Sequence, residues 1–551
     1  MKFTQHIALL LLILPFLHVP SYGQITGEGG VEQFGITIET GPAPIVLPPA
    51  RKGEVFDTTL YQLPPGDTLI FGDRITNLHG DGGTLPVYGE FDDPLVINAE
   101  GSIGTYISPR GRVSLEYAVD RWNGRGMLDL GSTAGHVDGA EAGTLLLRTQ
   151  LEYQIQGALP SPGKARATLG IDFGRDNYTL YGNSVAPFDR SRSIFDLDLG
   201  IASETDAAFD YTLGLSIESV SLSDDTLGVD HGVNALTPGF AARFRLGNDS
   251  LNLGAGLRYQ STSLDYDMLA SNPDFVEASG MVEWSPSPGF FVTAGGVIAH
   301  GTFSDSGSST LLMPRGAVRY EINRNMAIFG RFAPELRAPS YRSHIMTAPY
   351  VDREIVLRPE KVVIAGAGGI RLTAGSFTIE GEAFFEKGEN TPVVTLGGEV
   401  GELRWAYRDS RTIGVRGELH GNVGDRISLL GNLKIANAVN EATDEQLPMR
   451  PVVEAGGRVD LSFTSRLGAF GTVMFLGAQN TTSDVTTLPV GASPTLDARF
   501  LLGGGAEYQV SDDPHISIFA EVSNLLTQSY ESWQNYEAPG LELRLGGRAR
   551  F

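Results

Sequence analysis

The residues that most often perform acid–base or metal chemistry are spread thinly along this chain. Its nine histidines include no His-x-x-x-His or His-Glu-x-x-His spacing, the pattern with which a helix presents a zinc site. The chain has no cysteine, which excludes thiolate metal ligands and disulfides. Asp230-His231 pairs an acid with an imidazole, and we expect it in a polar loop. The stretch 157–164 misses a phosphate-binding loop in its glycine spacing and in Ala165, where Ser or Thr must stand. We therefore predict no catalytic residues, no metal and no cofactor.

A larger group of charged side chains occupies alternate positions within apolar stretches. In residues 251–260, for example, apolar side chains at odd numbers alternate with polar or small ones at even numbers. Because successive side chains of a β-strand point to opposite faces, the charged ones share one face. The charged members of this face are Asp172, Asp196, Asp198, Arg258, Glu380, Glu382, Arg416, Glu418, Asp497, Arg499, Arg544 and Arg548. Both signs occur, so these side chains either tune the passage of a solute through a lumen or pair with one another.

The elements that carry these charges are predicted to be long strands with one apolar and one polar face. Period-two alternation begins near residue 95 and recurs to the C-terminus. It is clearest in 165–174, 195–201, 251–260, 377–383 and 541–551. The strands reach about ten residues, the length that a tilted strand needs to cross a bilayer. A β-sandwich would also alternate, so the connections between strands decide between the two folds.

Short and long connections alternate between the predicted strands. The short turns fall at 286–289, 323–325, 375–376, 422–425, 465–466 and 511–514. The longer connections fall near 301–310, 334–360, 389–411, 439–451, 479–494 and 526–539. This rhythm is typical of outer-membrane barrels, in which the short turns are periplasmic and the long loops extracellular. The sequence therefore predicts an all-β fold, a transmembrane antiparallel β-barrel of about 22 strands, or about 20 if the ambiguous stretch 95–142 holds fewer.

Composition and the N-terminal sequence agree with an exported barrel. Charged residues make up 19% of the chain, whereas water-soluble chains average about 25%. The net charge of −24 argues against nucleic acid as a partner. Residues 1–23, with Lys2 before an apolar run and small residues before Gln24, are predicted to be a signal peptide. Residues 24–94 are rich in proline and lack alternation, so we expect an extension that is either disordered or lumenal, followed by the barrel at 95–551.

Four segments of the C-terminal half resemble motifs of TonB-dependent receptors, in the order that this family uses. Residues 332–341 (FAPELRAPSY) resemble its strand-end F-R-A-P-S segment, and 357–361 (LRPEK) resemble its L-x-P-E-K segment. Residues 407–419 and 522–540 resemble its Y-x-N … G-x-E-L step and its N-L-x-x-x-Y … P-G-R ending. The matching positions are Arg337, Pro339, Ser340, Pro359, Glu360, Asn524, Leu525 and the terminal Phe551. We interpret them as strand-end packing and loop-anchoring residues rather than ligand contacts.

The resemblance implies a barrel of the bacterial cell outer membrane that takes up a solute. The family also carries a folded plug and a short box that pairs with TonB, and residues 24–94 resemble neither. The leading hypothesis is therefore solute passage or uptake without a standard plug, either alone or with a periplasmic or plug-bearing partner. The alternative is a sealed structural or assembly scaffold without transport activity, and an outer-membrane enzyme is disfavoured. Outer-membrane lipid and the barrel assembly machinery, which reads a terminal aromatic such as Phe551, are the other expected partners.

Overall fold

The computed structural model describes residues 95–551 apart from 157–163, 183–186, 204–208, 227–228, 249, 267–269, 303–306, 339, 398–401, 425 and 483–492. The predicted signal peptide, the extension at 24–94, the glycine-containing stretch 157–163 and Pro339 lie outside the described residues. In the described ranges, no helix has the length and apolar character needed to cross a bilayer.

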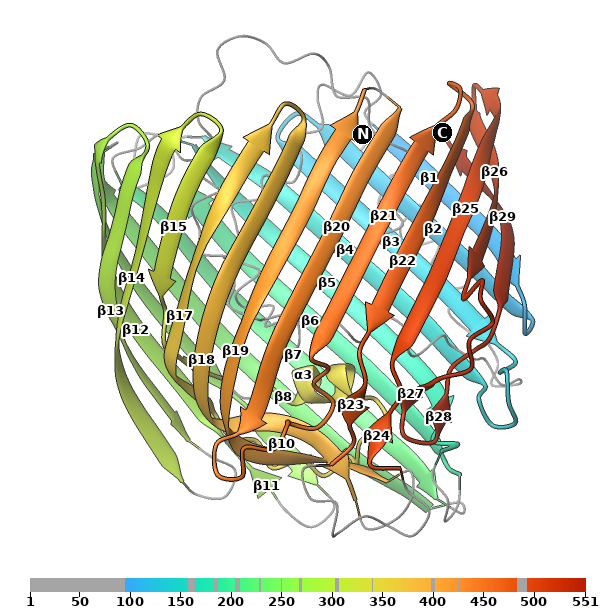
Figure 1. The fold of residues 1–551 in the computed structure, drawn as a ribbon, viewed down its shortest axis with the longest axis horizontal. Coiled ribbons are helices and arrows are strands. Elements are labelled where there is room, and N and C mark those ends of the chain that lie inside the picture. Colours follow the sequence, from blue (N-terminus) through green and yellow to red (C-terminus); the bar gives the residue numbers. More distant parts are fainter. Residues whose placement is uncertain are drawn as a thin grey trace, which may run out of the picture.

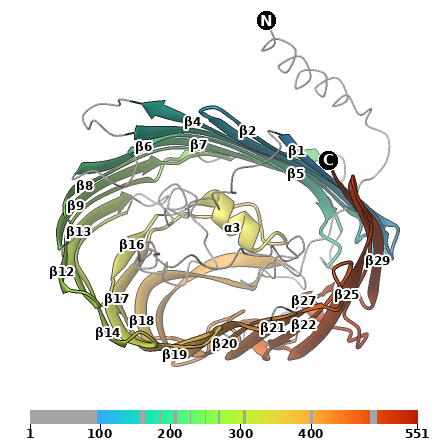
Figure 2. The same ribbon diagram turned by 90° about the horizontal axis from the view of Figure 1, so that it is seen from above.

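The described strands form one closed antiparallel β-barrel, which confirms the predicted fold class and strand number (Figures 1 and 2). The sheet contains 25 strands within the described residues, and 22 of them make the barrel wall because β10, β11 and β16 are short continuations. β1 pairs with β29 from Asn98↔Arg550 to Gly104↔Arg544, so the ring has no open edge.

The wall strands are β1 (Leu95–Gly104), β2 (Ser108–Val119), β3 (Trp122–Thr133), β4 (Ala142–Gln156), β5 (Lys164–Thr179), β6 (Asp189–Ser203), β7 (Phe209–Thr226), β8 (Val229–Gly247), β9 (Leu251–Ser261), β12 (Asp274–Ser287), β13 (Phe290–Thr302), β14 (Ser308–Asn323), β15 (Met326–Phe332), β17 (Glu360–Ala374), β18 (Phe377–Leu396), β19 (Leu403–Val423), β20 (Ile427–Asn440), β21 (Val453–Ser462), β22 (Leu467–Leu476), β25 (Arg499–Asp512), β26 (His515–Ser523) and β29 (Glu542–Arg550). The short elements are β10 (Ser263–Tyr266), β11 (Ala270–Ser271), β16 (Glu335–Arg337), α3 (Tyr341–Thr347), β23 (Gln479–Asn480), β24 (Thr495–Leu496), β27 (Glu531–Trp533) and β28 (Tyr536–Glu537).

The two ends of the barrel differ, as the alternation of connections predicts. Tight connections such as 288–289, 324–325 and 375–376 lie at one end, here named the turn end, together with the C-terminus (Figure 1). The opposite end, named the loop end, carries α3 and the two small sheets β23–β24 and β27–β28 (Figure 1). The secondary structure that departs from the simple barrel is therefore concentrated at the loop end.

The outer surface of the wall is apolar. On β9, Leu251, Leu253, Leu257 and Tyr259 are each more than 40% exposed and alternate with polar side chains. Trp284, Tyr320 and Tyr508 are also exposed and lie near the turn end, where an interfacial aromatic girdle would lie. Exposed apolar side chains are costly in water and favourable in lipid, so this surface suits a bilayer.

Strands at the loop end extend further than the sequence pattern indicates. The sequence predicts a loop at 389–411, but β18 continues to Leu396 and β19 begins at Leu403. A β-bulge between Gly388 and Thr391 interrupts the alternation, which hides the continuation of the strand. The added residues are stabilised by packing, because Val394, Leu396 and Leu403 are buried in a core inside the loop end.

The Asp230-His231 pair also lies in a strand rather than in the expected loop. Both residues belong to β8, where His231 stands opposite Asp224 of β7 in the antiparallel register. The β7–β8 hairpin is long, and its strands reach Thr226 and Val229. The polar composition of this stretch therefore reflects a strand outside the apolar belt and not an irregular loop.

Candidate functional site

A segment between β16 and β17 folds into the barrel and packs against its inner wall near the loop end. This cap segment, residues 340–358, contains α3, which lies inside the ring of strands (Figure 2). Ser340 caps the helix, because its side chain accepts a hydrogen bond from the Ser343 amide at 3.2 Å. The helix ends at Thr347 with Ala348 as its C-cap, and the chain then returns to the wall at Glu360.

Two apolar clusters hold the cap segment between different parts of the wall. On one side, Tyr341, Ile345, Ile355 and Leu357 pack against Val220, Leu222, Val233 and Leu264 of β7, β8 and β10. On the other side, Tyr350 and Val351 pack with Leu396, Leu403, Trp533 and Tyr536. Tyr350 and Tyr536 are stacked with their ring centroids 3.9 Å apart. The cap therefore has a core of its own, and burial of this apolar surface favours the closed arrangement.

Buried ion pairs add directional contacts between cap and wall. Arg190 of β6 is 2% exposed and forms two bonds to the Asp224 carboxylate, at 2.6 and 2.9 Å. Its remaining nitrogen donates to Pro349 O at 2.8 Å and to Val351 O at 2.6 Å. Arg353 of the cap donates to the same Asp224 carboxylate at 3.1 Å. Asp224 thus joins a wall arginine and a cap arginine.

A second anchor involves the helix. Arg342 of α3 donates to the Asp196 carboxylate at 2.8 Å and lies 3.6 Å from Glu218. Arg192 donates to Ile345 O at 3.0 Å and pairs with Asp176. The inner wall of β5–β7 therefore presents both signs of charge to the cap, and each side chain named here meets a complementary group.

A buried histidine lies at the centre of the cap. His344 Nδ1 is 2.7 Å from Ser340 O, and Nε2 is 3.3 Å from the Tyr407 hydroxyl. The imidazole also packs edge-on against Trp405, with ring centroids 4.6 Å apart. Burial lowers the pKa of His344 to about 4, because a charged imidazolium would lose its hydration there, and the Ser340 carbonyl opposes this only in part. His344 is therefore neutral at physiological pH.

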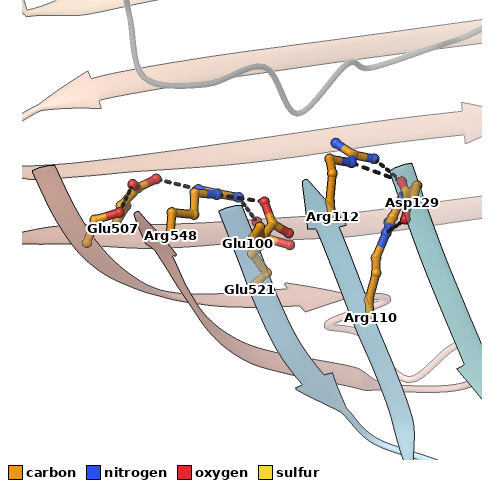
Figure 3. Close-up of polar contacts among 8 residues, drawn as sticks. Glu100, Arg110, Arg112, Asp129, Glu507, Glu521 and Arg548 are labelled. Atoms are coloured by element: carbon orange, nitrogen blue, oxygen red, sulfur yellow. Dashed lines mark hydrogen bonds and ion pairs between the residues drawn. The ribbon is translucent and has the colours of Figure 1, made fainter. Parts of the chain in front are cut away.

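The seam where the chain closes on itself carries a second polar cluster. The Arg548 guanidinium of β29 contacts Glu100 of β1 at 2.9 Å, Glu521 of β26 at 3.4 Å and Glu507 of β25 (Figure 3). It also lies 4.1 Å from the ring centroid of Phe519. One arginine therefore links four of the strands around the seam, including both terminal ones.

The ion pairs continue past the seam. Arg110 and Arg112 of β2 converge on the Asp129 carboxylate of β3, at 2.9 and 2.6 Å (Figure 3). Arg112 also stands opposite Glu100 in the β1–β2 register. The charges alternate in sign along this row, which favours the closed ring.

Most of the charged residues predicted for the lumen lie in wall strands, at positions that alternate along the strand with exposed apolar side chains. Glu382 contacts Arg331 at 2.9 Å and also pairs with Arg416, so two of these residues meet. Glu380 pairs with Arg371 at 2.6 Å and stands opposite Glu418 across β18 and β19. Asp497 is different, because it is exposed and precedes β25.

Among the other predicted lumen residues, Asp172 stands opposite Asp196 across β5 and β6, and the rest lie elsewhere around the ring. Their neighbours are as follows: Asp172 contacts Arg148 at 3.3 Å, Asp196 contacts Arg342, Asp198 stands opposite Ser216, Arg258 lies over the Phe275 ring, Arg499 donates to Glu531 O, and Arg544 stands opposite Glu521. Within the described ranges, no three His, Cys, Asp or Glu side chains gather as a metal site. The arrangement is a wall of paired charges with a cap across its loop end.

Comparison with known proteins places this geometry in a family. The family described as "TonB dependent receptor-like, beta-barrel" matches residues 59–525. This chain belongs to the TonB-dependent receptor family. No curated protein matches it in sequence. The fold is characteristic of bacterial outer membranes, and the proteins it resembles are transporters and receptors rather than enzymes.

Several solved structures share the fold at low sequence identity. The ferric yersiniabactin uptake receptor FyuA from Yersinia pestis is 14% identical with a TM-score of 0.64, over 84% of this chain and 80% of that one. The FrpB iron transporter from Neisseria meningitidis is 11% identical with a TM-score of 0.66, over 84% and 82%. The copper transporter OprC is 12% identical with a TM-score of 0.62, over 83% and 80%.

The positions that match receptor motifs flank the base of the cap. Arg337 contacts Glu335 at 2.6 Å, Glu360 at 3.0 Å and Glu386 at 3.3 Å, which joins β16, β17 and β18 at the point where the cap leaves the wall. Pro359 is buried beside Gly301. Ser340 caps α3, as described above. These contacts support the anchoring role that we assign to the motif.

The remaining motif positions lie in the final loop and at the seam. Asn524 has a positive φ of 46° and its side chain bonds Gln528 N, Gln528 O and Pro539 O at 2.8–3.2 Å. Leu525 is 54% exposed and makes no comparable anchor. Phe551 is 63% exposed, and its backbone pairs with Ile97 at 2.9 and 3.1 Å, which extends the β1–β29 ladder.

Sequence reasoning missed the residues that anchor the cap. Arg190, Arg192 and Asp224 continue the same polar alternation that identified Asp196 and Asp198, so this signal was available. Their partners in the cap give no such signal, because residues 340–358 belong to a long predicted connection without period-two alternation. Only the fold brings the two groups together.

Proposed function

We propose that this receptor-family barrel carries a solute across the outer membrane, and that the cap segment is its closure. Solute enters at the loop end, which faces the cell exterior, and passes when the cap is released from the wall. The observation that carries the proposal is the double attachment of the cap, by two apolar clusters and by the Asp224 and Asp196 anchors. A barrel of this size is otherwise wide, so a closure is needed to keep the membrane sealed.

The composition of the wall agrees with transport. Lumen charges of both signs are paired, as at Glu382 and Arg416, so the wall is polar without favouring one sign of ion. The neighbouring structures include an iron transporter and a copper transporter, which is a fold-level likeness and names no solute here. We further propose that residues 1–23 direct export and that β29 with Phe551 is recognised during barrel assembly. A periplasmic or plug-bearing partner would supply the force that releases the cap.

The test is single-channel conductance of the purified protein in a planar bilayer. Four forms are compared: the full chain, the chain without residues 24–94, the full chain with residues 342–356 replaced by a Gly-Ser linker, and a form with both changes. We expect silence in the full chain and steady conductance in the cap-replaced form. Removing 24–94 alone reports whether that segment adds to the closure.

Two outcomes would contradict this function. Large, steady conductance of the full chain would mean that the cap does not close the lumen. Silence in every form, including one that lacks both segments, would favour the sealed scaffold instead. Circular dichroism and heat-dependent gel migration of each form establish that the barrel is folded before conductance is interpreted.

A further inference from the structure

A row of aromatic rings leads from the rim of the barrel into the cap. The ring centroids are 6.0 Å apart between Tyr106 and His136, 6.3 Å between His136 and Tyr181, and 5.2 Å between Tyr181 and Tyr536. Tyr536 then stacks on Tyr350 of the cap segment. The first three rings are half-buried and belong to three different connections at the loop end, whereas Tyr536 is buried. Their successive planes are tilted by 66–87°, so the row presents both faces and edges.

The hairpin β27–β28 contacts two rings of this row through one backbone carbonyl. His136 Nε2 lies 2.7 Å from Glu537 O, and the Tyr181 hydroxyl donates to the same carbonyl at 2.8 Å. Burial, with Glu537 and Glu531 nearby, raises the pKa of the Tyr181 phenol, so the hydroxyl keeps its proton and remains a donor. His136 and Tyr181, which belong to different connections, thus bind the same backbone oxygen.

The connections that carry the row contribute charge of one sign. The connections that carry it, residues 105–107, 134–141, 180–188 and 524–541, contain four carboxylates and no lysine or arginine. The carboxylates are Asp138, Glu141, Glu531 and Glu537. Three wall arginines lie near the row: Arg190 pairs with Asp224, Arg192 pairs with Asp176, and Arg499 donates to Glu531 O at 3.0 Å. In the cap segment, Arg342 pairs with Asp196 and Arg353 with Asp224, so the four carboxylates outnumber the cations that are not paired with an aspartate. An anionic solute would be repelled here, and a cation would be attracted.

Two further features of the connections that carry the row are costly. Tyr106 and Ile107 both have positive φ, 60° and 50°, although Ile107 is β-branched and 72% exposed. At the hairpin tip, Gln534 is 1% exposed. Within the described part of the chain, neither atom of its side-chain amide has a hydrogen-bond partner. A buried amide without a partner destabilises a fold, so a group that arrives with a ligand would satisfy it.

We propose that this row is a recognition site for an organic cation, a solute with a methylated or substituted ammonium group. Tyrosine and histidine rings offer negative faces to the ammonium, and Glu531 and Glu537 balance its charge. A hydroxyl or carbonyl on the same solute bonds the Gln534 amide. The inference extends the proposed function, because it names the class of solute that the receptor captures at its loop end.

The experiment measures binding directly, by isothermal titration calorimetry of the full chain in detergent. The probes are tetramethylammonium and choline, with glucose as a neutral comparison and citrate as an anionic one. We expect both cations to bind, and Tyr181→Leu to weaken them by about 5- to 30-fold, whereas Tyr181→Phe stays within about twofold. Gln534→Leu should weaken choline more than tetramethylammonium, because only choline has a hydroxyl.

Matched variants guard against effects on folding. Asp444→Asn removes an exposed carboxylate of another loop-end connection, 77% exposed in its side chain, and should leave binding unchanged. Tyr106→Leu, in the tight connection 105–107, tests the row again if Tyr181→Leu does not fold. Absence of cation binding, binding that ignores both leucine variants, or binding of glucose or citrate instead would each overturn the inference. Conductance is not involved, so failure of the transport proposal and failure of this site are separate results.

Discussion

Replacing Asp224 with alanine tests whether the cap is held by its buried ion pairs. The side chain of Asp224 is 1% exposed and bonds the guanidinium of Arg190, itself 2% exposed, at 2.6 and 2.9 Å. Removing one partner of a buried pair leaves the other charge without compensation, which costs about 3–5 kcal/mol. Arg353 of the cap loses its 3.1 Å contact at the same time. We therefore expect the closed cap to be destabilised by about 4 kcal/mol, roughly a thousandfold in the open population.

The assay is channel opening in a planar bilayer, with two matched comparisons. Asp444→Ala removes an exposed carboxylate from the loop end, where its pair with Arg411 has side chains 77% and 48% exposed, and such pairs contribute about 0–1 kcal/mol. The double variant Arg190→Gln with Asp224→Ala removes both buried charges and keeps an amide donor for the cap carbonyls, so it should open less often than Asp224→Ala alone.

Two results would refute this account of how buried ion pairs hold the cap. One is a folded Asp224→Ala protein that is as silent as the parent, which would mean that the apolar clusters suffice to hold the cap. The other is a double variant that opens at least as often as the single one, because the effect would then not arise from an isolated buried arginine. Heat-dependent gel migration verifies that every barrel is closed.

Three further results follow from the same contacts. The pKa of His344 is lowered to about 4 in the closed cap, so closure is fully favoured above about pH 6.5 and weakens as the pH falls from 6.5 toward 4. Channel openings should therefore rise about 30-fold at pH 5, and His344→Gln should abolish this pH dependence. Arg548→Ala should lower the temperature at which the barrel unfolds on gels by removing about 2–4 kcal/mol at the seam, since its side chain is only 27% exposed; an unchanged temperature would show that the strand ladder alone closes the ring. Asn524→Ala removes three side-chain hydrogen bonds and places at positive φ a residue that tolerates it less well than asparagine, so limited proteolysis should cut the 524–541 loop several-fold faster. Asn524→Gly tolerates the positive φ but lacks the hydrogen bonds, so it should recover only part of the protection.

The sequence by itself determined the wall of this protein. Period-two alternation is a local property, because neighbouring side chains of a strand point to opposite faces whatever the rest of the fold does. The tight turns at 323–325 and 375–376 are local too, since Asn-Arg-Asn and Gly-Ser suit abrupt reversals. Strand length and the asymmetry of the connections then left a closed barrel of about 22 strands as the consistent solution.

Only the tertiary structure decided that the barrel is capped. Arg342 meets Asp196 across 146 residues of sequence, and Arg190 meets Val351 across 161, so no local pattern records either contact. The same holds for the continuation of β18 to Leu396, which depends on a core shared with Tyr350 and Trp533. A long connection on a water-filled rim and one packed inside a lumen both lack period-two alternation. What separates them is whether complementary charges and apolar side chains lie on the facing wall, and closure of the ring creates that wall.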